Sequence, residues 1–230
     1  REALWSPAMV VRIGMAPRAP HLSFEEFQAH WSSEHGALAG GLAGLTSYIQ
    51  NHAILRAGRP LLPYPGFDAC SELCFESLES MDAAFASEHY TKAVQTDEKN
   101  LIDKTRFGMM LTSRRVLDDG DPGENAVKLL TFFAIDRNSS LDELSEALAG
   151  PYRDAVATAN PLRHEQLIQI PGAHDSRRAP MADAADLLWF RSADEALAFV
   201  SSDANFAASY ALTGRAFGAQ RHLAHTITVV

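Results

Sequence analysis

Hydrophobic and polar positions repeat along this chain with two different periods. Strict alternation, as in "RHEQLIQI" from Arg163, is typical of β-strands, and apolar residues at helical spacing, such as Phe24, Phe27 and Trp31, indicate one face of a helix. The first half of the chain predicts strands near 8–15, 45–55, 68–76 and 106–116, with helices near 24–37 and 78–95. The second half predicts strands near 127–135, 162–170, 185–191 and 221–229, with helices near 141–157 and 193–209. The two halves therefore contain the same elements in the same order.

Two pairs of segments support an internal repeat. "SFEEF" at 23–27 and "SLDEL" at 140–144 begin 117 residues apart, and each carries the Ser and carboxylate of a capping box at a helix start. "FESLESMDAAFASEHY" and "FRSADEALAFVSSDAN" begin 115 residues apart, at Phe75 and Phe190. The segment "DDGDPGEN" is acidic and rich in Gly and Pro, as linkers are. We predict one repeat over 1–117, a linker over 118–125 and a second repeat over 126–230.

The order β-α-β-β-α-β, found twice, predicts an α+β protein built from two ferredoxin-like repeats. Each repeat covers only one face of its antiparallel sheet with helices, so the other face needs a partner. The second repeat supplies that partner within the same chain. We therefore expect the two sheets to pack into a barrel with a small-molecule pocket in its interior, and a further homo-oligomer stays open.

Composition narrows the range of partners. The chain has 230 residues, with 20 basic and 29 acidic side chains and a net charge of -9, which argues against a nucleic-acid partner. No apolar run approaches the roughly 20 residues that cross a bilayer, and the start lacks the pattern of a signal peptide. Cys70 and Cys74 lie on a predicted strand, too far apart to bridge easily. We expect a cytoplasmic protein with no membrane partner and reduced thiols; whether residues precede Arg1 stays open.

The segment "HWSSEHGALAGGLAGLTSYIQNH", residues 30–52, concentrates the candidate chemistry. His35 follows Trp31 by four residues and Phe27 by eight, so the three share a helix face. A histidine there is either a core residue near the end of a helix, where a cation is favoured, or a group that faces a pocket. His30 points away from that face and is expected in solvent.

The strand that follows carries a polar cluster. Alternation places Tyr48, Gln50 and His52 on one face and Asn51, with apolar Ile49, on the other. We expect the face with Ile49 to pack beneath the helices and the first set to line the barrel interior, unless the strand simply faces solvent. Asn51 would tie a backbone group, unless a bulge re-aims it toward the pocket.

Other charged groups are weaker candidates. Glu165 lies on the strand face that mirrors Tyr48, so it could add a carboxylate to the shared interior. Arg106 and Arg153 are alternative groups for binding an anion, although such residues usually lie at the surface. His89 and Tyr90 are expected on a polar helix face.

The segment "EEFQAHWSSEHGALAGGLAGLTSYIQNH" resembles the EthD domain, a member of the dimeric α+β barrel superfamily. The resemblance covers roughly residues 8–115 and rests on Phe27, Trp31 and His35 with the strand residues that follow. It implies stacked ferredoxin-like units that form a barrel, and a His35 that faces the pocket mouth. It also implies small-molecule chemistry, often dehydration, cyclisation or isomerisation without a cofactor. The second half departs from this pattern, since His35 falls on Tyr152 and His52 on Gln169.

The residue types favour proton transfer. The chain has no Walker loop, no GxGxxG after a strand and no Cys/His cluster at zinc spacing, so we expect neither a cofactor nor a metal. A histidine can remove and return a proton near neutral pH, and Tyr or Gln can stabilise developing charge. These groups suggest a cofactor-independent, dehydratase-type lyase or an isomerase that acts on an aromatic or carbonyl-bearing molecule. The resemblance to the EthD domain implies that this molecule belongs to catabolism or polyketide-like metabolism. The expected catalytic residues are His35 and His52. The expected substrate-binding residues are Trp31, Tyr48, Gln50, Asn51 and Glu165.

Two alternatives stay open. One is a cofactor-free or haem-linked oxygenase, in which His52 would be the axial ligand of a haem. The other is a non-enzymatic protein that binds small hydrophobic ligands. The identity of the substrate, and which histidine is acid and which is base, are not determined by the sequence.

Overall fold

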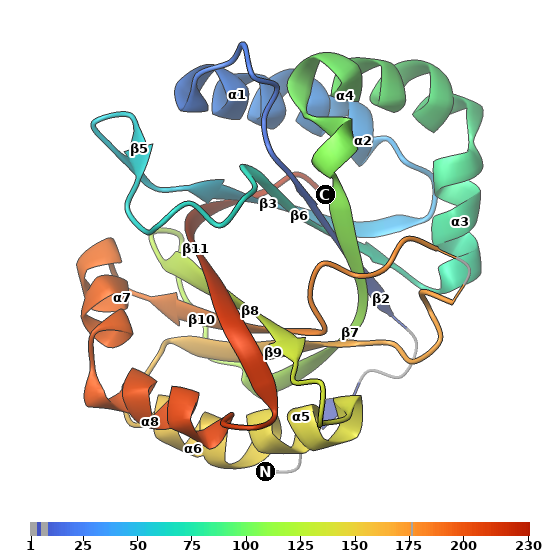
Figure 1. Ribbon diagram of the computed structural model, residues 1–230. Helices are drawn as coiled ribbons and strands as arrows, with labels where there is room; N and C mark the ends of the chain where they lie inside the picture. The colour runs from blue at the N-terminus through green and yellow to red at the C-terminus, as the bar shows by residue number, and fades with distance from the viewer. Residues whose placement is uncertain (1–3, 6–8, 176) are drawn as a thin grey trace.

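Eight antiparallel strands close a barrel within the single chain (Figure 1). The computed structural model describes residues 4–5, 9–175 and 177–230. The first half contributes strands in the order β7-β2-β6-β3 and the second half in the order β11-β8-β10-β9. The barrel closes where β3 pairs with β11 and β7 pairs with β9. The predicted α+β barrel of two β-α-β-β-α-β units is thus confirmed.

The strands lie close to the ranges that alternation predicts. Those of the first half are β2 (Val10–Ala16), β3 (Leu45–Ala53), β6 (Ala69–Phe75) and β7 (Gly108–Asp118). Those of the second half are β8 (Val127–Ile135), β9 (Arg163–Gln169), β10 (Ala184–Phe190) and β11 (Ala216–Thr228). Outside the barrel order, β1 (Leu4–Trp5) pairs with β7, and β4 (Leu55–Arg56) pairs with β5 (Arg59–Pro60). The domain boundaries at 117 and 126 stay a prediction, and the start of the first domain lies outside the described residues.

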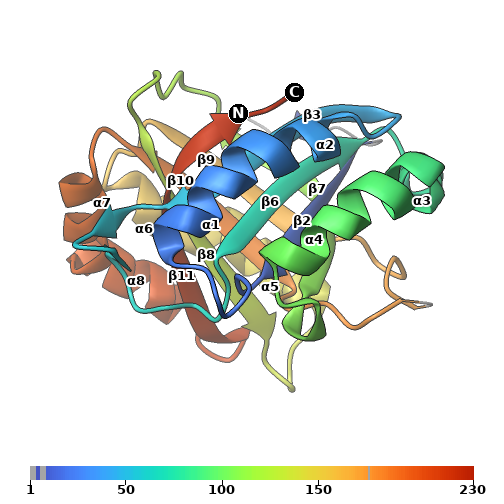
Figure 2. The same cartoon turned by 90° about the horizontal axis from the view of Figure 1, so that it is seen from above.

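Helices cover the two outer faces of the barrel (Figures 1 and 2). Over the first sheet lie α1 (Phe24–His30), α2 (Gly36–Gly40), α3 (Leu78–Ala86) and α4 (Gln95–Leu101). Over the second lie α5 (Leu141–Ala147), α6 (Arg153–Ala157), α7 (Ala193–Val200) and α8 (Asp203–Ala211). Both predicted capping boxes are present, at Ser23 and Ser140. None of these helices is long and apolar enough to cross a membrane.

Wide π-helical turns interrupt three of the four predicted helices. They are η1 (Trp31–His35), η2 (Tyr90–Val94) and η4 (Leu148–Tyr152). A side chain from the neighbouring strand ties two of them to the sheet: Gln50 Nε2 donates to Trp31 O over 2.7 Å, and Gln166 Nε2 donates to Leu148 O over 2.9 Å. The turn at η1 and the turn at η4 therefore occupy equivalent places in the two repeats.

The barrel interior is a packed core rather than the predicted pocket. Its apolar residues come from both sheets and include Val11, Ile13, Cys70, Met110, Leu130, Phe132, Leu167 and Leu187. Among them runs a chain of alternating charges: Lys128 pairs with Glu72, Glu72 with Arg114, Arg114 with Glu165, and Glu165 with Arg163. Glu165 does face the interior, but two arginines occupy its carboxylate. The expectation of an interior pocket is therefore wrong.

This charge chain joins the two halves. Glu72 and Arg114 come from the first sheet, and Lys128 and Glu165 from the second. Burial alone would raise the pKa of Glu72, but the charges of Lys128 and Arg114 outweigh it and hold that pKa below its usual value. A fully buried carboxylate or ammonium without a partner is strongly destabilising, so the pairing of Glu72 and Lys128 matters to the stability of the barrel.

We predict that Glu72→Leu lowers the free energy of unfolding by about 3–5 kcal/mol, because it leaves the Lys128 ammonium buried without a carboxylate. The double variant Glu72→Leu/Lys128→Leu should regain much of that loss, since no unpaired ammonium is left. Urea unfolding of the two variants measures both values. Lys92→Met, which removes the exposed Lys92–Glu88 pair, serves as the surface control. A single variant as stable as the unaltered chain would show that the pair does not stabilise the barrel.

Candidate active site

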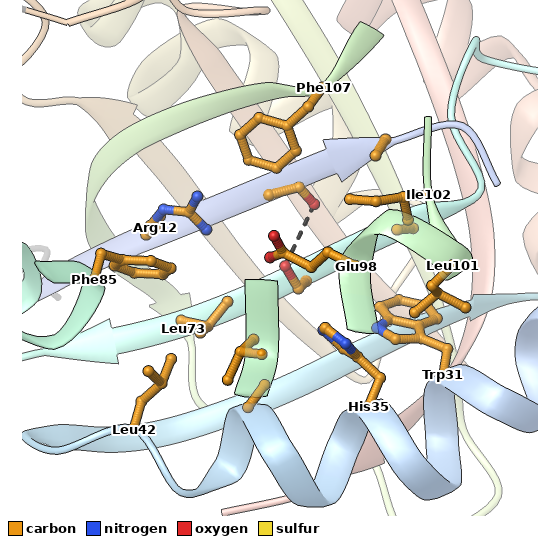
Figure 3. A pocket seen from close by; sticks show the side chains of 16 residues that line it. Arg12, Trp31, His35, Leu42, Leu73, Phe85, Glu98, Leu101, Ile102 and Phe107 are labelled. Atoms are coloured by element: carbon orange, nitrogen blue, oxygen red, sulfur yellow. Dashed lines mark hydrogen bonds between the residues drawn. The ribbon is translucent and has the colours of Figure 1, made fainter. Parts of the chain in front are cut away.

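A cavity of about 50 Å³ lies between the first sheet and its covering helices (Figure 3). Strands β2 and β6 supply its floor, with Arg12 and Ser71. Turn η1 supplies Trp31 and His35. Side chains on and after α4, among them Glu98, Leu101, Ile102 and Phe107, complete the wall. The cavity thus lies on the helix side of the sheet, outside the barrel.

His35 is held by a carboxylate at this cavity. Its Nδ1 lies 2.8 Å from Asp97 Oδ2, and His30 Nε2 lies 2.7 Å from Asp97 Oδ1. An ionised carboxylate can only accept hydrogen bonds, so His35 Nδ1 must donate, which leaves Nε2 of the neutral ring as a proton acceptor. This is the arrangement of a general base oriented by a carboxylate. His35 lines this cavity, and its catalytic role stays a prediction, whereas His30 is half-buried and bonded to Asp97 rather than free in solvent.

The π-helical turn brings Trp31 and His35 onto the same wall. Residues four apart share a helix face, and wide turns of this kind often occur at functional sites. Gln50 fixes the turn by its hydrogen bond to the Trp31 carbonyl. Trp31 is the one predicted substrate-binding residue that lines the cavity.

The rest of the predicted strand cluster does not line the cavity, and its orientation is the reverse of the expected one. Tyr48, Gln50 and His52 face the helices, where Gln50 bonds both the Tyr48 hydroxyl and His52 Nε2 over 2.9 Å. The His52 ring packs on Trp31 with 4.4 Å between centroids. Asn51 faces the barrel interior and donates to Glu72 Oε1 and Cys70 O. The Asn51 amide thus bonds the carboxylate of Glu72, one of the charges in the interior, which explains why this polar side chain points inward.

His52 does not fit the alternative role of haem ligand. Its ring is buried against Trp31, and its Nε2 donates to Gln50 Oε1. The nearby cavity of about 50 Å³ is far below the roughly 300–1,000 Å³ of typical cofactor and ligand pockets. The residues present therefore do not form a haem site at His52.

One group of side chains has the spacing of metal ligands within the described part of the chain. The donor atoms of His30, Glu34 and Asp97 lie within 4.8 Å of one another, on the side of Asp97 that faces away from His35. The hydrogen bond between His30 and Asp97 already brings two of the three residues together, and Glu34 is exposed. A metal ion there would contact Asp97 rather than the cavity.

Sequence reasoning missed Arg12, Asp97 and Glu98. The Arg12 guanidinium lies 4.2 Å from the Phe85 ring and 5.3 Å from the Phe107 ring (Figure 3). Burial lowers its pKa, an effect that the charges of Tyr90 and Glu98 partly offset. An arginine inside the apolar run "VVRIGM" was the available signal.

The arginines predicted as anion-binding alternatives lie elsewhere. Arg106 pairs with Asp103, and Arg153 pairs with Asp154. Neither lines the cavity. Arg106 is exposed and Arg153 is half-buried.

The equivalent place in the second half holds a buried polar cluster. Asp186 accepts from His164 Nε2 over 2.6 Å and from the Tyr152 hydroxyl over 3.1 Å. Tyr152 stands where the first repeat has His35, and Asp186 stands where it has Ser71. All three side chains are buried and satisfy one another. The two repeats therefore share a frame but differ in the chemistry of this position.

Residues 19–105 match the family model of the EthD domain. The match spans 87 of the 230 residues, all of them in the first half of the chain. No curated protein matches the chain in sequence. The EthD segment contains η1, His35 and Asp97, and thus most of the cavity wall.

Similar solved structures agree on the fold of the whole chain. An anthrone oxidase-like protein is 15% identical, with a TM-score of 0.70 and coverage of 99% of this chain and 96% of that one. A protein provisionally named a monooxygenase, from Lactobacillus acidophilus NCFM, is 12% identical, with a TM-score of 0.55 and coverage of 97% and 95%. A mutant chlorite dismutase from Candidatus Nitrospira defluvii, in complex with cyanide, is 10% identical, with a TM-score of 0.55 and coverage of 97% and 93%.

These likenesses show that the chain shares the α+β barrel fold of these proteins, and the names of the proteins do not agree with the expected reaction. The sequence suggested a dehydratase-type lyase or an isomerase. The similar structures carry the names of an oxidase, a monooxygenase and a chlorite dismutase. The expectation of a lyase or isomerase is therefore wrong.

The environment of His52 generates a prediction on pH. Burial, with a smaller contribution from the charge of His222, lowers the pKa of His52 to about 4. The unfolded chain, with a histidine pKa near 6.5, binds the proton more readily, so the stabilisation from neutral His52 is complete above pH 6.5 and is lost as the pH falls toward 4. The expected loss over this range is about 3 kcal/mol.

Urea unfolding between pH 7 and 4.5 measures this loss. His52→Phe keeps a ring against Trp31 and should show a shallower fall in stability, whereas His225→Phe, at an exposed histidine, should keep the original slope. Equal slopes for His52→Phe and the unaltered chain would contradict the prediction.

Proposed function

We propose that the chain is a cofactor-independent oxygenase that oxidises an aromatic molecule with an acidic CH₂ group conjugated with a carbonyl group. The observation that supports this most strongly is the His35–Asp97 pair, because His35 lines a cavity together with Trp31 and Phe107. The likeness to an anthrone oxidase-like protein supports the same reaction class.

The proposed reaction starts with proton removal. His35 Nε2 takes a proton from the substrate carbon, and Asp97 stabilises the imidazolium that forms. The electron-rich carbanion then transfers an electron to O₂, and the two radicals couple into a peroxide. His35 returns its proton to the peroxide, which forms a hydroperoxide.

Loss of water completes the oxidation. His35 removes the second hydrogen of the same carbon as a proton, the O–O bond breaks, and the departing hydroxide takes the proton from His35. The balance is CH₂ plus O₂ giving C=O plus H₂O. The apolar walls keep bulk water away from the carbanion, so that O₂ rather than a solvent proton reacts with it.

The size of the cavity limits which species enters without rearrangement. A space of about 50 Å³ accommodates O₂ but not an aromatic ring system. An aromatic substrate therefore requires Ile102 and Phe107, at the edge of the cavity in Figure 3, to swing outward. Both belong to the segment that follows α4, which includes the short helix Lys104–Arg106.

We also propose that the protein is cytoplasmic. Cys70 and Cys74 are free, buried thiols, as expected for a protein of a reducing compartment. The barrel is complete within one chain, so the proposed chemistry needs no partner subunit, although a homo-oligomer is compatible with it.

Oxygen uptake with anthrone as the probe substrate tests the proposal. We expect the EDTA-treated protein to consume O₂ well above the rate without protein and to form anthraquinone with one atom from ¹⁸O₂. His35→Gln should lower kcat about 10²-fold to 10⁴-fold, because the base is lost. His225→Gln, which removes an exposed histidine, should keep the full rate.

Three outcomes would contradict the proposal. Full activity in His35→Gln would show that this histidine is not the base. Activity that EDTA abolishes and a metal restores would shift attention to the group formed by His30, Glu34 and Asp97. Anthrone that stabilises the protein and is recovered unchanged would favour a non-enzymatic binding protein instead.

A further inference from the structure

Arg12 is the unexplained charge at the cavity. Its guanidinium makes no hydrogen bond and no ion pair with any residue in the described part of the chain, although its side chain is largely buried on the cavity floor. Its contacts are the rings of Phe85 and Phe107, at 4.2 and 5.3 Å from the guanidinium carbon. Ring faces attract a cation but leave its N–H donors unused.

The nearest acidic group does not pair with it. Glu98 contributes to the electrostatic environment of Arg12, yet its carboxylate is bonded to Lys104 and to the Tyr90 hydroxyl. Partly buried donors without a partner are unfavourable, so a site that keeps five of them beside a cavity is suited to an anion from outside.

We propose that Arg12 binds a carboxylate on the substrate, so that the substrate class is an aromatic carboxylic acid. This inference rests on the proposed function for the identity of the reaction, but the anion site itself does not depend on turnover. A guanidinium matches the two oxygens of a carboxylate with two parallel hydrogen bonds. Phe85 packs against the guanidinium, and Trp31 offers an aromatic wall for the ring of the substrate.

Equilibrium binding tests the proposal without any reaction. Calorimetry would compare 2-naphthoate with its neutral analogue 2-naphthylmethanol. We expect naphthoate to bind the unaltered chain more tightly than the alcohol does, and Arg12→Met to weaken naphthoate binding about 10-fold to 100-fold, because hydrogen bonds to charged groups are lost. Arg137→Met, at an exposed arginine, is the matched control and should bind as the unaltered chain does.

Further variants keep the test decisive. Arg12→Lys retains the positive charge but lacks the planar guanidinium, so its affinity for naphthoate should lie between that of the unaltered chain and that of Arg12→Met. If Arg12→Met does not fold, Arg12→Lys takes its place in the comparison. His35→Gln should lose oxygen uptake but keep naphthoate binding, which separates failure of the proposed reaction from failure of the anion site. Equal binding of acid and alcohol, absence of naphthoate binding, or unchanged affinity in both Arg12 variants would overturn the proposal.

Discussion

The charges buried inside the barrel decide where this protein can hold a ligand. Lys128, Glu72, Arg114 and Glu165 neutralise one another across the two sheets, and apolar side chains fill the remaining space. Because these charges are tolerated only while they are paired, the interior cannot open without a large loss of stability. Space for chemistry is therefore left on the outer faces, between each sheet and its helices.

The two repeats use that outer space differently. Each has a π-helical turn tied to the sheet by a glutamine, Gln50 in one and Gln166 in the other. In the EthD half, His35 and Ser71 face a cavity, whereas in the second half Tyr152 and Asp186 occupy the same places and bond each other. The two repeats thus share the same elements, but the first places His35 at a cavity, whereas the second buries Tyr152 and Asp186 as a hydrogen-bonded pair.

Local sequence patterns predicted the frame well. Capping boxes at Ser23 and Ser140 and alternation in strands such as β9 depend on neighbours in sequence, so they are visible without a structure. The orientation of β3 was predicted wrongly, because a single apolar residue, Ile49, was a weak guide to which face of the strand packs under the helices. The deciding interaction for that strand, between Asn51 and Glu72, joins residues from different strands.

The candidate site was predictable only in part. His35 and Trp31 stood out by spacing and by their resemblance to the EthD pattern. Asp97 is 62 residues from His35 in sequence, and its role follows only from the packing of α4 against η1. Arg12 carried a signal, as a charge within an apolar strand, but its lack of a partner is a property of the folded chain.

The central claim is that ligands bind between the first sheet and its helices rather than inside the barrel. Methyl-resolved NMR of the protein titrated with 2-naphthoate tests this most directly. We expect shifts at the cavity methyl groups of Leu42, Leu73, Val94, Leu101 and Ile102, with little change in the interior at Leu130, Leu167 and Leu187. Shifts centred on the interior leucines, with the cavity methyl groups unchanged, would contradict the account.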